Sequence, residues 1–153
     1  MTRVIDIMTR EVATIGPDGS LPDVIALIMQ HKIAGLPVVA PNGELVGVIS
    51  EVDILRRLFP DYNEFIGDID GAMEFDFTDL KLDHLRTLRV NDVMHSNPIS
   101  VSPSENVMKA CGLMVSHKIR RLPVVDPATN RLVGIVSQGQ VFQEILRLAA
   151  AHA

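Results

Sequence analysis

A chain of 153 residues with 47% hydrophobic side chains is long enough to bury a core, either as one domain or as two small ones that share it. No window reaches the ~18 uninterrupted apolar residues of a membrane span, so we expect a soluble protein. The net charge of -5 argues against a nucleic-acid coat, and the single cysteine, Cys111, excludes an intramolecular disulfide. The first residues, MTRVIDIM, lack the apolar stretch of a signal peptide, so the expected compartment is the cytoplasm.

The first predicted helix spans residues 20–31. Ser20 and Asp23 have the spacing of a capping box, and the Pro-Asp-Gly at residues 17–19 is typical of a turn. Apolar side chains recur at helical spacing on one face, at Leu21, Val24, Ile25, Ile28 and Met29. His31 falls in the last turn, where a hydrogen-bonding side chain suits the free carbonyls, so we interpret it as a capping group and not as a metal ligand.

A β-hairpin is predicted next, with strands at residues 36–40 and 45–49 around the tight turn Asn42-Gly43. The second strand runs directly into a helix whose expected N-cap is Ser50. Such a step presents free backbone N–H groups and a partial positive charge, which suit a phosphate or a sugar oxygen.

Asp53 lies three residues after Ser50, and the pair has two interpretations. The carboxylate can accept two hydrogen bonds from a vicinal diol such as that of a ribose. The same spacing also forms a capping box, in which both side chains only satisfy donors of the helix. The pattern of these two residues leaves both interpretations open.

Residues 59–89 form an acidic segment, with eight acidic residues against three basic ones, and contain five of the six aromatic residues. Helical spacing relates Tyr62, Phe65, Ile66 and Ile69, and Thr78 can cap a further helix through Leu88. We therefore predict an ordered helical insertion whose apolar face packs on the rest of the chain or on a partner. The acidic residues lack the spacing of an EF-hand, so no metal site is expected here.

The chain repeats itself at an offset of 86 residues. Residues 4–8 recur as 90–94 and residues 31–39 as 117–125, and after one inserted residue 45–50 recur as 132–137. Both copies therefore carry the same order of helix, hairpin and helix.

In the second copy, Ser102 with Glu105 is predicted to cap a helix that ends near His117. Strands at residues 122–126 and 132–136 and a helix at residues 138–150 follow. Neither copy buries its sheet well alone, at roughly 55 residues. The sequence thus predicts an α+β fold of two pseudo-symmetric units, residues 3–58 and 90–148, packed through their small sheets, with the helical insertion at residues 59–89 between them.

Two features occur in both copies: the segment HKI..LPVV, and a strand-to-helix step that reads Gly, two hydrophobic residues and Ser, with Asp three residues later in the first copy. A tandem pair of this kind resembles the cystathionine-beta-synthase (CBS) domain family. The resemblance implies a pair with pseudo-twofold symmetry whose clefts bind adenosine compounds such as AMP, ADP, ATP or S-adenosylmethionine and regulate another activity. It also implies a disc-like homodimer.

The resemblance places the family's ribose-binding aspartate at Asp53 and its nearby hydroxyl residue at Ser50. The positions that line the adenine and the sugar match Ile15, Ile33, Ala34 and Gly35. The phosphate-contacting basic pair of the opposite unit matches Arg120 and Arg121, although a surface salt-bridging role for these arginines stays open.

The second copy departs from this pattern, because Gln140 stands where the first copy has Asp53. A neutral amide oxygen accepts more weakly than a carboxylate, by on the order of 1 kcal/mol per bond. The first copy in turn offers only Ala34 and Gly35 where the second has arginines. We therefore expect the cleft of Asp53 and the arginines to be filled, and the cleft at Gln140 to be weak or empty.

The sequence pairs no nucleophile with an oriented base and contains no glycine-rich phosphate loop. We thus expect no enzyme, no catalytic residue and no metal site, but a regulatory module that binds AMP, ADP or ATP ahead of S-adenosylmethionine. The expected partners are a second copy and an unknown regulated protein, with neither nucleic acid nor membrane. The alternative is a ligand-free scaffold for protein interactions, whose clefts have decayed.

Overall fold

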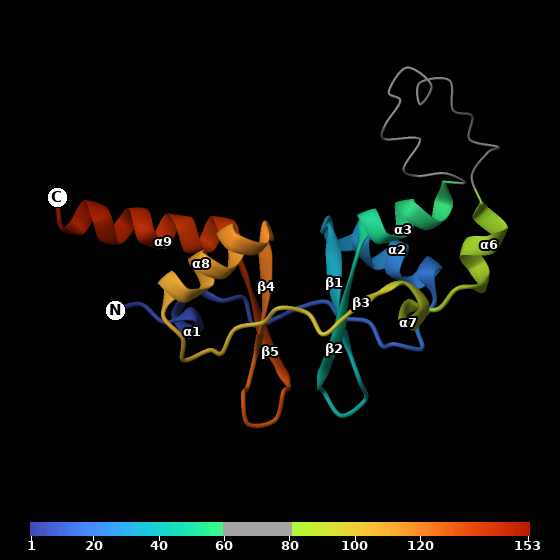
Figure 1. Cartoon of the computed structure of the whole chain (residues 1–153), viewed down its shortest axis with the longest axis horizontal. Helices are drawn as coiled ribbons and strands as arrows, with labels where there is room; N and C mark the ends of the chain where they lie inside the picture. The colour runs from blue at the N-terminus through green and yellow to red at the C-terminus, as the bar shows by residue number, and fades with distance from the viewer. Residues whose placement is uncertain (60–80) are drawn as a thin grey trace, which may run out of the picture. The chain divides into compact units, whose positions relative to one another are not determined.

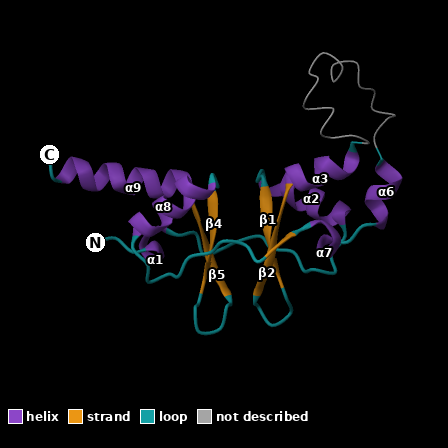
Figure 2. Cartoon of the chain, in the orientation of Figure 1, coloured by secondary structure: helices purple, strands orange, loops and turns teal. Residues whose placement is uncertain are grey.

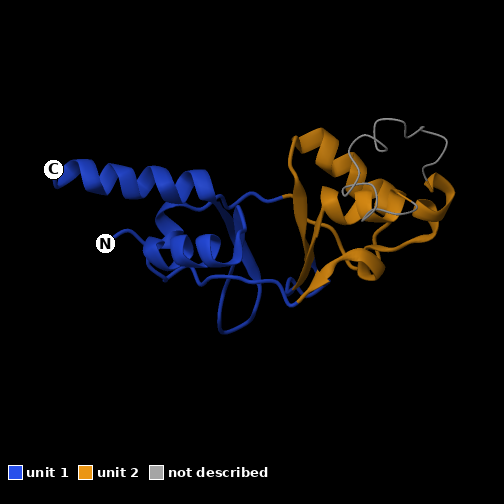
Figure 3. Ribbon diagram, turned by 45° about the horizontal axis from the view of Figure 1, so that its top comes forward, with its two compact units in different colours: residues 1–12, 39–45, 97–153 blue, residues 13–38, 46–96 orange. Residues whose placement is uncertain are grey.

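The computed structural model describes residues 1–59 and 81–153 and divides them between two compact units (Figures 1 and 3). Unit 1 contains residues 1–12, 39–45 and 97–153, and unit 2 contains the described parts of 13–38 and 46–96. Helices are combined with small antiparallel sheets, which confirms the predicted fold class (Figure 2). Most of the predicted insertion, including Tyr62, Phe65, Ile66, Ile69 and Thr78, lies outside the described residues.

Unit 2 holds most of a three-stranded sheet in the order β1-β2-β3. Its elements are α2 (Leu21–His31), β1 (Gly35–Val39), β2 (Leu45–Ser50), α3 (Glu51–Leu58), α6 (Leu82–Thr87), α7 (Val90–Val93) and β3 (His95–Ser96). Helix α2 begins as the sequence predicts, because the Ser20 hydroxyl oxygen accepts a 3.2 Å hydrogen bond from the backbone N–H of Asp23. Its last residue is His31, and the C-cap Lys32 has left-handed backbone angles.

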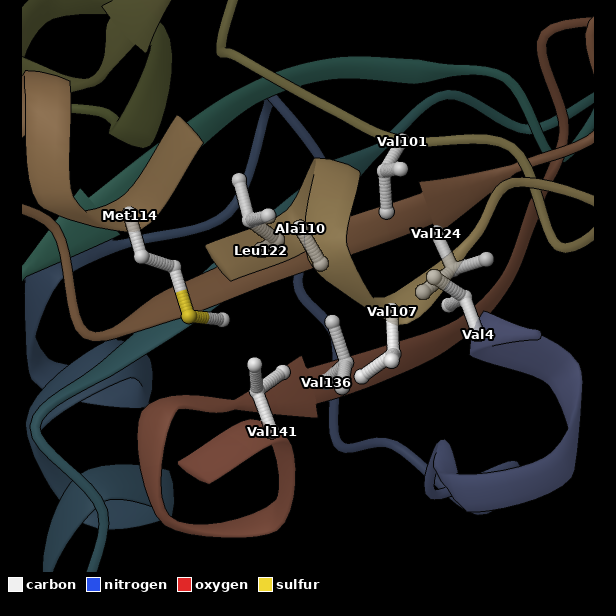
Figure 4. Packing of buried hydrophobic residues seen from close by; sticks show 9 residues of the cluster. All are labelled: Val4, Val101, Val107, Ala110, Met114, Leu122, Val124, Val136 and Val141. Atoms are coloured by element: carbon white, nitrogen blue, oxygen red, sulfur yellow. The ribbon is translucent and has the colours of Figure 1, made fainter. Parts of the chain in front are cut away.

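Unit 1 is built on a two-stranded antiparallel sheet covered by two long helices. Its elements are α1 (Val4–Ile7), α8 (Val107–His117), β4 (Arg121–Val125), β5 (Leu132–Ser137) and α9 (Gln138–Ala151). The buried core joins α1, α8 and α9 to both strands and to Val101 (Figure 4). Leu122, Val124 and Val136 supply the sheet side of this core, each at 0% exposure.

The start of helix α8 differs from the prediction. The helix begins at Val107, and its N-cap is Asn106, whose side-chain oxygen accepts a 2.8 Å bond from the backbone N–H of Met108. The predicted cap Ser102 instead lies in a turn, where its hydroxyl contacts that of Ser104. The prediction was wrong because residues 102–106 offer several side chains of the capping type, and packing of the fully buried Val107 decides which of them caps.

The segment that leads into each sequence repeat packs in the unit formed mainly by the other repeat. The backbone N–H of Val4 donates to the carbonyl of Glu105 at 2.8 Å in unit 1, and that of Val90 donates to the carbonyl of Gly19 at 2.9 Å in unit 2. Both valines are fully buried. Each compact unit is thus made of chain from both repeats, while the repeat boundaries given above stay a prediction.

Directly after these segments the chain crosses a strand of the same unit. Thr9 pairs with Ile135 through two backbone hydrogen bonds of 2.8 and 2.9 Å, and β3 pairs antiparallel with β2 so that His95 lies opposite Val48. Buried glycines permit this crossing, because a β-carbon at Gly47 would lie 2.7 Å from the His95 carbonyl oxygen. At Gly134 it would lie 2.8 Å from the Thr9 carbonyl oxygen.

The N-terminal segment is also tied to helix α9 by its second residue. The Thr2 hydroxyl donates to Glu144 Oε1 at 2.6 Å, and Arg147 donates to both oxygens of the same carboxylate, at 2.6 and 2.9 Å. The Arg147 guanidinium first, and the Thr2 hydroxyl second, lower the pKa of Glu144 to about 2.

Within the described residues, no helix is long and apolar enough to span a membrane.

Candidate functional site

Strand β2 runs without a break into helix α3, and Ser50 and Asp53 form a complete capping box at this step. The backbone N–H of Asp53 donates to the Ser50 hydroxyl oxygen at 3.3 Å. In return, Asp53 Oδ2 accepts from the Ser50 backbone N–H at 2.9 Å and from its hydroxyl at 3.0 Å. The capping interpretation is therefore confirmed, and any ligand must use what the cap leaves free.

The Asp53 side chain is only 5% exposed, so its charge requires a partner, and the partner is His95. His95 Nε2 lies 2.8 Å from Asp53 Oδ1, and the histidine side chain is itself 63% exposed. It reaches the carboxylate because the β2–β3 register places it opposite Val48, two residues before Ser50. His95 is not among the site residues predicted from the sequence.

The other predicted site residues of the first repeat belong to the same unit. Gly35 begins β1 so close to β2 that a β-carbon there would lie 2.8 Å from the Ile49 carbonyl oxygen and 3.2 Å from Ser50 Cα. The Ala34 carbonyl accepts a 2.9 Å bond from the N–H of Glu51, the first residue of α3. Close approach at this point thus requires glycine.

Ile15 and Ile33 are half-buried and pack against the core of unit 2. The N–H of Ile15 donates to the Pro37 carbonyl at 3.2 Å, which holds the segment before α2 beside strand β1. Both side chains belong to unit 2 and stand at positions predicted to line the adenine and the sugar.

Unit 1 contains the corresponding step from β5 into α9, with a neutral side chain in place of the carboxylate. Gln140 Oε1 accepts from the Ser137 N–H at 2.9 Å, and the Gln140 N–H donates to the Ser137 hydroxyl oxygen at 3.2 Å. The remaining amide nitrogen of Gln140 donates to the Thr9 hydroxyl at 3.0 Å. Thr9 occupies the position in the repeat that His95 occupies in the other copy.

The predicted phosphate ligands Arg120 and Arg121 are exposed and lie in unit 1. Arg121 is opposite Ser137 in the β4–β5 register, and the Arg120 carbonyl accepts a 2.7 Å bond from the N–H of Gln138. Within unit 1, Arg120 and Arg121 therefore lie beside the step from β5 into α9 that contains Gln140. Its approach to Asp53, which belongs to the other unit, stays a prediction.

No group of three or more His, Cys, Asp or Glu residues that could hold a metal ion occurs among residues 1–59 and 81–153. His117 contacts its own helix instead, since Nδ1 lies 3.1 Å from the Leu113 carbonyl oxygen. That contact is the helix-end role that the sequence predicts for His31, the residue at the equivalent position of the first repeat.

Comparison with known proteins finds matches over nearly the whole chain. The family model of the CBS domain matches the chain twice, at residues 4–60 and 90–147. The chain is 35% identical to the CBS domain-containing protein CBSX2, a chloroplastic protein of Arabidopsis thaliana, over 94% of this chain and 63% of CBSX2. This chain thus spans just under two thirds of that relative's length.

Solved structures show the same fold. A crystal structure of CBSX2 in complex with AMP has a TM-score of 0.72 and 32% identity, and the match covers 97% of this chain and 99% of that one. The CBS domain pair of protein MJ0100, in complex with 5'-methylthioadenosine and S-adenosyl-L-methionine, has a TM-score of 0.66 and 25% identity, with coverage of 100% and 99%. Both neighbours were crystallised with adenosine compounds.

Proposed function

The chain belongs to the CBS domain family and carries the domain twice in tandem, and we propose from this that it is a non-catalytic regulatory module that binds an adenine nucleotide. One observation supports the ligand most directly: a chain that matches this one over 97% of its length was crystallised with AMP. The buried carboxylate of Asp53, near the N-terminus of a helix, supplies acceptor oxygens that can form charge-assisted hydrogen bonds with a ribose diol.

In the proposed complex, Asp53 and Ser50 bind the ribose. Ile15, Ile33, Ala34 and Gly35 line the adenine and the sugar, and Arg120 and Arg121 of the other unit contact the phosphates. The arginine pair favours a ligand with phosphate groups, so AMP, ADP or ATP is preferred over S-adenosylmethionine. The corresponding cleft at Gln140 is the weaker one, since its amide accepts without charge assistance.

The proposed response passes through a homodimer to a regulated protein, as in a sensor of cellular energy. Apolar side chains exposed on α8 and α9 support such an interface, with Met108 at 51%, Val115 at 62%, Phe142 at 37% and Leu146 at 68% exposure. Gly112 lies on the same helix as Met108 and Val115, and a β-carbon there would meet nothing within 4 Å. The cytoplasm remains the proposed compartment, although the relative CBSX2 is chloroplastic.

One observation favours the second candidate, a ligand-free scaffold. Oδ2 of Asp53 already accepts two hydrogen bonds from Ser50, and Oδ1 is in ion-pair contact with His95, so the carboxylate needs no ligand to be satisfied. If the cap and the ion pair were its whole role, the chain would act only through its surfaces.

Thermal melting with AMP, ADP, ATP and S-adenosylmethionine distinguishes the two candidates. A ligand at 100 times its dissociation constant stabilises the folded state by about 2.7 kcal/mol. We expect AMP, ADP or ATP to raise the melting temperature of the wild type and of Gln140→Ala, which removes the same helix cap in the other unit. Asp53→Ala, compared with its own ligand-free melting temperature, should show no such rise. The absence of a shift with all four compounds would favour the scaffold.

A further inference from the structure

The Asp53 carboxylate has too few free acceptor positions to bind a ribose diol while its present contacts persist. A carboxylate offers about four lone-pair positions, two on each oxygen. Oδ2 accepts from the backbone N–H and the hydroxyl of Ser50, and His95 Nε2 lies in ion-pair contact with Oδ1 at 2.8 Å. With the imidazole at that distance at most one position remains, whereas the two hydroxyls of the diol require two.

Of the three groups in contact with the Asp53 carboxylate, the imidazole is the one that can leave without loss of the fold. The Ser50 bonds belong to the cap of α3, and Asp53 itself is buried. The His95 side chain is 63% exposed and extends from the two-residue strand β3, whose residues are both exposed. When the imidazole moves into solvent, the capping box stays complete and Oδ1 becomes free.

We propose that His95 blocks the ribose site in the free protein, with its imidazole on Asp53 Oδ1, and that a bound adenosine compound displaces it. This inference rests on the proposed function, because it needs Asp53 to be the ribose ligand. The other repeat has no such blocking group, since Thr9 at the corresponding position of unit 1 contacts an amide and carries no charge.

The test is calorimetric titration with AMP at a single pH, which compares the wild type with His95→Thr, the residue of the other repeat. We expect His95→Thr to bind AMP more tightly than the wild type, by up to about five-fold, because no ion pair has to break before the ribose reaches Asp53 Oδ1. His84→Gln, which removes an exposed imidazole from α6 of the same unit, should bind AMP as the wild type does.

Two results would overturn the inference about His95. A His95→Thr protein that binds AMP with the affinity of the wild type would show that the imidazole does not compete, and one that loses binding would show that the imidazole contacts the ligand. Asp53→Ala separates this failure from that of the proposed function. If Asp53→Ala binds AMP as well as the wild type, or if neither binds it, the ribose site itself is wrong.

Discussion

Replacing Gly47 by alanine places a methyl group where β3 crosses β2, and we expect this to lower the free energy of unfolding by about 1–3 kcal/mol. The new β-carbon would lie 2.7 Å from both the His95 carbonyl oxygen and the Met94 sulfur. The sulfur is the far end of a flexible side chain and can move. The carbonyl belongs to the backbone of β3, so relief requires the strand itself to move away from β2.

Gly134→Ala is the matched change in unit 1. Its β-carbon would lie 2.8 Å from the Thr9 carbonyl, which already accepts a 2.9 Å hydrogen bond from the Ile135 N–H. We expect a similar loss of stability. Gly139→Ala is the control, because its new β-carbon would have only an ordinary contact, 3.9 Å from the Ser137 hydroxyl. At this helical position alanine should stabilise by up to about 1 kcal/mol.

Urea unfolding of the three variants, with the melting temperature as a second measurement, gives these differences directly. At this chain length each kcal/mol corresponds to about 2–4 °C. If Gly47→Ala and Gly134→Ala were as stable as the wild type while Gly139→Ala behaved as expected, the close crossing of strand and leading segment would be refuted.

Two further changes test other parts of the molecule. The lowered pKa of Glu144, about 2 against an ordinary 4.5, means that its contribution to stability is present above pH 4.5 and is lost as the pH falls toward 2. Glu144→Gln should therefore be less stable than wild type in urea at pH 7 and nearly equal to it at pH 2, and a difference that stays constant with pH would contradict this. Val115→Glu on the exposed face of α8 should convert the proposed dimer to monomers in sedimentation velocity, whereas Lys109→Glu on the same helix should not. A wild type that sediments as a monomer would remove the dimer from the proposal.

Local pattern predicted the elements well, because each depends on neighbours a few residues away. Ser50 with Asp53 and Ser137 with Gln140 both form the capping boxes that their spacing indicates. The start of α8 was missed for the same local reason, since Asn106 and Ser102 are both good capping residues and only tertiary packing selects one of them.

The ion pair of the candidate site required information that no local pattern contains. His95 reaches Asp53 because the segment that leads into the second repeat crosses a strand of the first, 42 residues away in the chain. A signal was nevertheless present in the repeat alignment, where Thr9 and His95 follow matching Val-x-Asp-x-Met-type segments. The two copies differ at this position, as they also differ at Asp53 and Gln140. In the structure His95 contacts Asp53 in one unit, and Thr9 contacts Gln140 in the other.

The segment that leads into each repeat packs in the unit formed mainly by the other repeat, so a shorter form of this chain would lack part of its core. A polypeptide that ends at residue 59 would keep Val4 without the residues around Val107 that bury it, and would lack Val90 for its own core. Two such polypeptides could each insert the segment around Val4 into the core of the other, so a single repeat is expected to be stable only as a swapped pair.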